Sequence, residues 1–195
     1  MNWGEIQIES LKKMFLNNDN LEVNKLDEYK KDKKYRTYLF MMPQAANEAI
    51  NYILENGQPL IQEYILSENV TRFDLNKLPN FKRLYQVSSS SYLPSYRVEG
   101  NNQLVINGNY GDIIIYYETY LDLLDQRTSK STEIELNPYL VNLIPLYIAG
   151  ELYKDDDVQL ATIYMNEFMS LVESYKGRDS SCNSNEITTI YNGVF

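Results

Sequence analysis

The side chains that could do chemistry in this sequence are carboxylates, lysines, tyrosines and a single thiol, Cys182. The 195 residues include no histidine, which removes imidazole as a general base, as a partner for a serine or cysteine nucleophile, and as a zinc ligand. We therefore expect a non-enzymatic protein with no catalytic residues, no cofactor and no metal site. An enzyme would depend on a metal held by carboxylates alone, and no spacing among the 27 acidic residues marks such a set.

Three short motifs resemble reactive sites, and each has a simpler structural interpretation. Asp155–Asp157 could bind Mg²⁺ or Ca²⁺, but three consecutive side chains diverge and no calcium-loop glycine or glutamate follows, so we expect a helix cap. Gly108–Gly111 lacks the Lys-Ser/Thr of a phosphate-binding loop, which favours a turn between strands. Ser88–Ser91 has no neighbouring base to activate a nucleophile, which favours a loop.

The charge of the chain argues against tight binding of nucleic acid. The formal net charge is −9, whereas proteins that wrap DNA need clustered Lys and Arg to neutralise phosphates. The one basic cluster, Lys30–Lys34, is typical of a solvated face. An acidic surface is compatible with DNA that passes through a protein, because a repulsive wall lets the polymer slide. The 18 tyrosines suit half-buried strands and interfaces without indicating a ligand.

Nothing in the sequence indicates a membrane segment or a secretory route. No run of about 18 uninterrupted apolar residues occurs, and Met1–Glu5 lacks the start of a signal peptide. A single cysteine excludes an intramolecular disulfide and fits a chain folded in a reducing cytoplasm. We expect Cys182 to be a surface thiol, with its reactivity left open.

The elements that must position these side chains change in type along the chain. Apolar residues at helical spacing predict one helix over 5–17 and a second over 44–56, which Pro43 starts and Gly57 stops. The stretch between them is charged and is expected to be irregular, with at most a short helical turn near Tyr35–Phe40. β-branched and aromatic runs predict strands in the middle of the chain, over 60–66, 82–87, 95–99, 103–107 and 112–120, with a hairpin turn at Gly100–Asn102. The last strand is apolar on both faces, so we expect it to be covered on both, either inside the domain or by a neighbouring chain.

The last third returns to helix. Asn137 and Pro138 form a start signal for a helix through Tyr153, and Pro145 should kink or interrupt it. A tight turn then leads into a helix from 158 to about Tyr175, closed by Gly177. Two helices joined by so short a turn must pack antiparallel.

These elements predict an α+β fold: a helical bundle from the N- and C-terminal segments, an inserted antiparallel β-domain and an extended C-terminal arm. The expected divisions are 1–58 for the N-terminal helices, 59–133 for the β-rich region, 134–177 for the C-terminal helical hairpin and 178–195 for the arm. The arm ends on apolar side chains, and docking on the chain's own surface or on another protein are both open. These side chains are Ile187, Ile190, Tyr191, Val194 and Phe195.

Two adjoining stretches carry a family resemblance. Asn137–Asp157 (NPYLVNLIPLYIAGELYKDDD) and Leu160–Phe168 (LATIYMNEF) resemble head–tail connector, or adaptor, proteins of tailed bacteriophages. Gly4–Phe15 and Met42–Ile50 are similar to the same proteins, so the likeness covers about half of the chain at its two ends. These are packing motifs, and they indicate a fold more directly than the role of any residue.

The resemblance implies a structural virion protein at the neck, assembled in the host cytoplasm. It implies a homo-oligomeric ring, commonly of twelve copies, that joins the portal protein to the tail or a stopper protein and lines the channel through which genomic DNA passes. It also implies that the five apolar residues of the arm bind the portal. Twelve copies would carry a formal charge of about −108, twelve times −9.

Two other interpretations stay open. Within phage biology, the chain could be another neck component, either a stopper or a tail-completion protein. Outside it, the tyrosine-rich strands could form a monomeric binding module.

Overall fold

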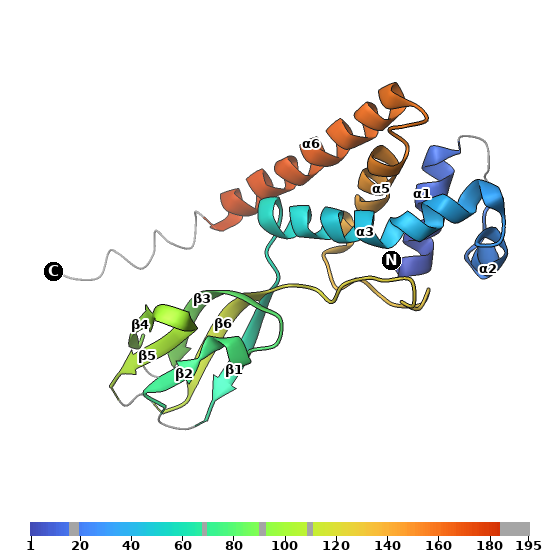
Figure 1. Cartoon of the computed structure of the whole chain (residues 1–195). Helices are drawn as coiled ribbons and strands as arrows, with labels where there is room; N and C mark the ends of the chain where they lie inside the picture. Colours follow the sequence, from blue (N-terminus) through green and yellow to red (C-terminus); the bar gives the residue numbers. More distant parts are fainter. Residues whose placement is uncertain (16–19, 68–69, 90–92, 109–110, 184–195) are drawn as a thin grey trace. The chain divides into compact units, whose positions relative to one another are not determined.

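The structure, a computed structural model, describes residues 1–15, 20–67, 70–89, 93–108 and 111–183, with backbone alone for 176–183. It divides into two compact units that are considered separately (Figure 1). A helical unit combines Met1–Gln58 with Leu123–Phe195, and a β-unit comprises Pro59–Asp122. The α+β class expected from the sequence is confirmed. The β-unit ends before 133, the limit expected from the sequence, because 123–133 pack on the helical unit. Asn47 bonds both backbone groups of Leu124 at 2.9 Å, and the Trp3 amide donates to the Thr132 carbonyl at 2.8 Å.

The first helix, α1 (Trp3–Met14), confirms the expectation of a helix at the start of the chain. It begins with a capping box, in which the Asn2 side chain accepts from the Glu5 amide at 2.9 Å and the Glu5 carboxylate accepts from the Asn2 amide at 2.8 Å. Its apolar stripe buries Trp3, Ile6, Leu11 and Met14 almost completely. A short 3₁₀ turn, η1 (Val23–Lys25), and one helical turn, α2 (Leu26–Tyr29), follow.

The second long helix, α3 (Lys33–Asn56), corrects the sequence analysis: Pro43 lies inside it, and the stretch expected to be irregular forms its first half. The Asp32 carboxylate caps it by accepting from the Lys34 amide at 2.9 Å. An interior proline costs about 3 kcal/mol. This cost is outweighed because Leu39, Met42 and Ala46 continue one buried face across the proline.

The C-terminal helices bear out the expected effect of Pro145. The helix that starts at Pro138 stops after one turn as α4 (Pro138–Val141), and the chain resumes as α5 (Ile144–Leu152) with Pro145 in its first turn. The long helix α6 (Val158–Asn183) runs past Gly177, where the sequence analysis expected it to close. The expected arm therefore begins as helix over 178–183.

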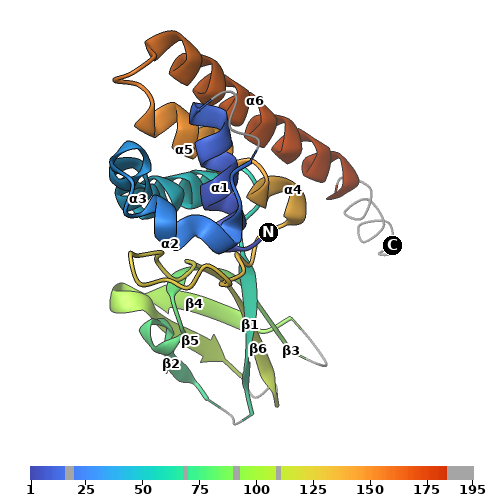
Figure 2. The same cartoon turned by 90° about the vertical axis from the view of Figure 1, so that its right-hand side faces the viewer.

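Helix α5 lies between α6 and α3 in the helical unit, and both views show this order (Figure 1, Figure 2). Gly150 allows α5 and α6 to approach closely, since a Cβ there would lie 3.1 Å from the Ala161 carbonyl oxygen. Phe168 is fully buried from α6, with its ring 5.1 Å from that of Tyr147 and 5.4 Å from that of Tyr52.

The β-unit contains two antiparallel three-stranded sheets, with strand orders β1-β6-β3 and β2-β5-β4. Its core comes from the inward side chains of both sheets, including Val87, Leu104, Ile106, Ile113 and Ile115. A 3₁₀ turn, η2 (Leu75–Lys77), follows β2, and another, η3 (Gly100–Asn102), joins β4 to β5 where the sequence predicted a hairpin. Of the strands that the structure describes, the sequence analysis missed β2, the shortest. The strands are β1 (Ile61–Leu66), β2 (Arg72–Asp74), β3 (Phe81–Ser89), β4 (Ser95–Glu99), β5 (Gln103–Asn107) and β6 (Ile113–Thr119).

Candidate functional site

Two of the three consecutive aspartates, Asp156 and Asp157, cap and brace the start of α6. The Asp157 carboxylate accepts from the Leu160 amide at 3.0 Å, which confirms the expected helix cap. The Asp156 carboxylate accepts a hydrogen bond of 2.5 Å from the Tyr38 hydroxyl of α3. No group of three metal-ligating side chains occurs among the described residues.

A hollow of about 430 Å³ lies beside these aspartates, between the first half of α3 and the turn from α5 to α6. Its size is within the range of small-molecule pockets, but its charges are balanced, so no net field selects an anion or a cation. Lys154 and Glu151 already pair with each other at 2.5 Å. The charged lining comprises Lys33, Lys34, Lys154, Glu151, Asp155 and Asp156.

Two tyrosines of the helical unit, of which Tyr38 lines this hollow, have pKa values above the ordinary tyrosine value of about 10. Burial, followed by the hydrogen bond to Asp156, raises the pKa of Tyr38 to about 12. Burial, followed by the nearby charges of Glu48 and Glu151, raises the pKa of Tyr147 to about 12. Both hydroxyls therefore stay protonated at neutral pH and serve as hydrogen-bond donors, a structural role rather than that of a nucleophile or base.

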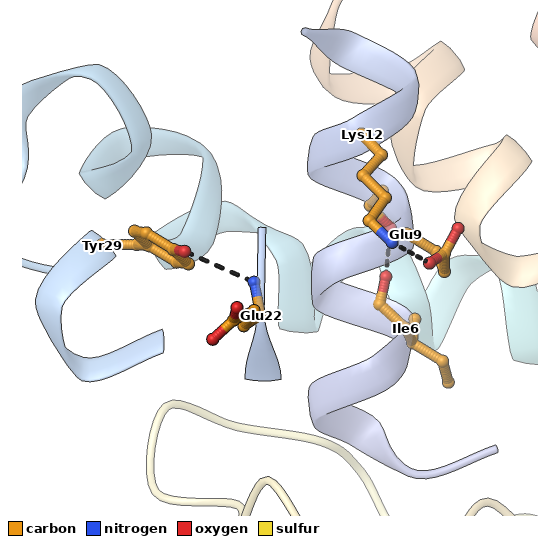
Figure 3. Close-up of polar contacts among 6 residues, drawn as sticks. Ile6, Glu9, Lys12, Glu22 and Tyr29 are labelled. Carbon is orange, nitrogen blue, oxygen red and sulfur yellow. Dashed lines mark hydrogen bonds and ion pairs between the residues drawn. The ribbon is translucent and has the colours of Figure 1, made fainter. Parts of the chain in front are cut away.

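Short ion pairs and hydrogen bonds fix the surface next to α1 and α2 (Figure 3). The Lys12 ammonium lies 2.8 Å from the Glu9 carboxylate, one turn away on α1. The Glu22 amide donates to the Tyr29 hydroxyl at 3.3 Å, which ties the start of η1 to α2. These contacts stabilise the local geometry of the helical unit.

The two outer faces of the β-unit differ in character. On the β2-β5-β4 sheet, Glu99 pairs with Arg97 at 2.8 Å and with Arg72 at 3.7 Å, which is typical of a solvent face. On β6 the sequence predicted a strand that is covered on both faces. Its outward residues Ile114 and Tyr116 are half-buried.

Glu118, at the end of the outward row on β6, is 3% exposed. One of its oxygens lies 2.7 Å from the Arg83 guanidinium, and Oε2 has no hydrogen-bond partner among the described residues. Among the described residues Glu118 is the most completely buried acid, and sequence spacing gave no sign of it.

The residues that the sequence assigned to portal binding lie outside the described residues. These are Ile187, Ile190, Tyr191, Val194 and Phe195. Cys182 lies in the last turns of α6, where the backbone alone is described. Gly108 and Gly111 adopt positive φ angles of 118° and 70° between β5 and β6, which agrees with the expected turn between strands. Ser88 and Ser89 belong to β3 rather than to a loop.

Sequence reasoning also missed the bond between Tyr38 and Asp156, because the two residues are 118 positions apart in the chain and Tyr38 stands in no motif. None of the helices that the structure describes is long and apolar enough to cross a membrane. No protein-family model matches the chain. No curated protein matches it either.

Proposed function

We propose that this chain is a structural subunit of the neck of a tailed bacteriophage, a head–tail connector whose ring joins the portal vertex to the tail. The observation that carries the proposal is the order of its parts. Helices from both ends of the chain form one unit, and a β-sandwich is inserted between them. Connector proteins, which 137–168 resemble, have a helical bundle, in some cases with a β-domain inserted between its helices.

The surface chemistry supports a passive role in DNA passage. The chain carries a formal charge of −9 at pH 7. A channel lined by such subunits repels the phosphate backbone, so DNA slides without sequence-specific binding. A ring of twelve copies on the portal, with the tail or a stopper on its other side, is the assembly proposed.

The apolar residues of the arm are proposed to anchor the ring to the portal. Deleting 187–195 should leave a folded subunit, with unchanged helical circular dichroism and thermal midpoint, that no longer binds the portal in a sedimentation assay. The matched control changes only polar arm residues, Thr188, Thr189 and Asn192, to alanine and should bind as the wild type does. Portal assembly that survives the deletion would overturn the anchor.

Portal binding also separates the connector from the other neck components. A connector binds the isolated portal, whereas a stopper or tail-completion protein binds only after another neck protein is in place. Light scattering of the chain with the portal alone therefore distinguishes them.

A tyrosine-rich binding module is a second candidate because the β-unit exposes aromatic rings. Tyr64, Tyr85 and Tyr96 are 40%, 56% and 39% exposed. A chain that remains monomeric with the portal but binds a small ligand through these rings would favour this module over the connector.

A further inference from the structure

We infer that the free edge of β1 is a binding site for an extended segment of another protein, in which a basic residue stands between two apolar residues. Strand β1 lies at one edge of the β1-β6-β3 sheet, and among the described residues it pairs with β6 alone (Figure 2). An edge strand presents a row of unpaired N–H and C=O groups, with which a further strand can pair. This site lies wholly on the β-unit and is independent of the proposed ring.

The register of β1 on β6 identifies the backbone groups that are free. The Thr119 amide donates to the carbonyl of Leu60, the residue directly opposite, at 3.0 Å. In an antiparallel ladder such hydrogen-bonded pairs alternate with pairs whose backbone groups point away from each other. Every second residue of β1 after Leu60 therefore bonds to β6, and the residues between them direct their N–H and C=O groups toward the free edge. These residues are Ile61, Glu63 and Ile65.

The side chains of the same three residues form an apolar–acidic–apolar row. Ile61 and Ile65 are 39% and 54% exposed, and Glu63 between them is exposed as well. Glu63 has no ion-pair partner among the described residues. A strand that pairs with this edge places its alternate side chains directly beside the row. Two apolar side chains with a cation between them complement it.

The other sheet edges of the β-unit carry protection that β1 lacks. Proteins block edges with very short strands, with bulges and with positively charged side chains. Strand β2 has three residues, β3 has two register shifts against β6, and β4 carries Arg97. Strand β1 has six residues in unbroken register, with no lysine, arginine or proline among them. Its edge is therefore the one best suited to accept a further strand.

The charge of Glu63 selects against a second copy of β1. Two antiparallel copies that pair their free edges along the full strand set Ile61 opposite Ile65 and Glu63 opposite Glu63. Like charges directly opposite each other destabilise a strand pair. A segment with a central lysine or arginine replaces this repulsion with attraction, so the occupant is a different sequence.

A synthetic peptide tests this site on the full-length chain. The probe is Thr-Val-Thr-Lys-Thr-Val-Thr, which reads the same in both directions and so fits either strand orientation. In NMR spectra of the ¹⁵N-labelled chain, saturable binding should shift the amide resonances of Ile61, Glu63 and Ile65 more than those of Gln62 and Tyr64, whose N–H groups bond to β6. A control peptide with N-methylated valine and lysine amides keeps every side chain but loses these donors, and it should not bind.

Charge reversal tests the preference for a cation. Glu63→Lys should weaken binding of the lysine peptide about fivefold and should favour a peptide with glutamate at its centre. Glu135→Lys, the same charge change at an exposed position of the helical unit, should bind as the wild type does. Equal binding of the two peptides by the wild type would overturn the assignment of a basic segment.

Three further results would overturn the site: no saturable binding, binding that survives N-methylation, or an edge that another segment of this chain already occupies. Occupation by the chain itself would appear as shifts of the three amides when 187–195 are deleted, or as shifts on dilution of a self-associated wild type. Portal binding is not a readout of these measurements, so their failure leaves the connector proposal to its own test.

Discussion

At the scale of single residues, Tyr38 should make stability depend on pH at the alkaline end. Its pKa is about 12 in the folded protein and near 10 in the unfolded chain, so its contribution is complete below pH 10 and is lost between pH 10 and 12. Thermal unfolding of Tyr38→Phe should therefore decline less steeply than that of the wild type across this range. Tyr85→Phe, at an exposed position on β3, should match the wild type. Parallel pH profiles for wild type and Tyr38→Phe would contradict the prediction.

Glu118 and Arg83 form an unequal pair, since the carboxylate is buried and the guanidinium side chain is 71% exposed. Removing each partner should therefore have a different effect. Arg83→Ala leaves a desolvated carboxylate without its partner and should lower the thermal midpoint clearly. Glu118→Met removes the buried charge at similar volume and should be neutral or stabilising. Differential scanning calorimetry of both variants would reveal the order, and equal losses would refute it.

At the scale of elements, the cap of α6 offers a measurable contribution. Asp157→Ala removes the acceptor of the Leu160 amide and should lower the free energy of unfolding by about 1 kcal/mol. Asp155→Ala removes a neighbouring acid that makes no described cap bond, so urea denaturation should show a much smaller change. A comparable loss in both variants would mean that general charge near the helix start, rather than the cap, is responsible.

The elements that the sequence predicted well are those with local signals. Asn137-Pro138 and Pro145 mark the breaks around α4 and α5, and Gly100–Asn102 marks the hairpin between β4 and β5. Pro43 led to a wrong prediction of the start of α3, because the preference of proline for a helix start is a local effect. The helix continues through Pro43 because its buried face packs against other parts of the fold, which local sequence does not show. Gly177 misled in the same way, since a glycine costs only about 1 kcal/mol inside a helix.

The candidate surfaces were harder to predict than the fold. Contacts such as Tyr38 with Asp156 arise from packing between distant segments, which periodicity does not report.

At the scale of the whole molecule, the β-unit should be removable. Strands β1 and β6 are its first and last, and they pair with Ile61 opposite Glu118, while the Thr119 amide donates to the Leu60 carbonyl at 3.0 Å. The chain enters the β-unit beside Leu60 and leaves it beside Thr119, and we call these two connecting segments the chain crossings. Because they lie side by side, a short Gly/Ser linker can replace 59–122 without stretching the helical unit. We expect circular dichroism to show an intact, cooperatively melting helical unit. Loss of that transition would show that the helices need the insertion.

The paired crossings also have a mechanical consequence. A domain attached by one connecting segment can rotate about the single bonds of that segment, so a torque applied to the domain is not transmitted. Here two strands run out together and are tied to each other at Leu60 and Thr119. Turning one unit about their common direction would have to wind one crossing around the other. A double attachment of this kind resists twisting more than a single connecting segment does.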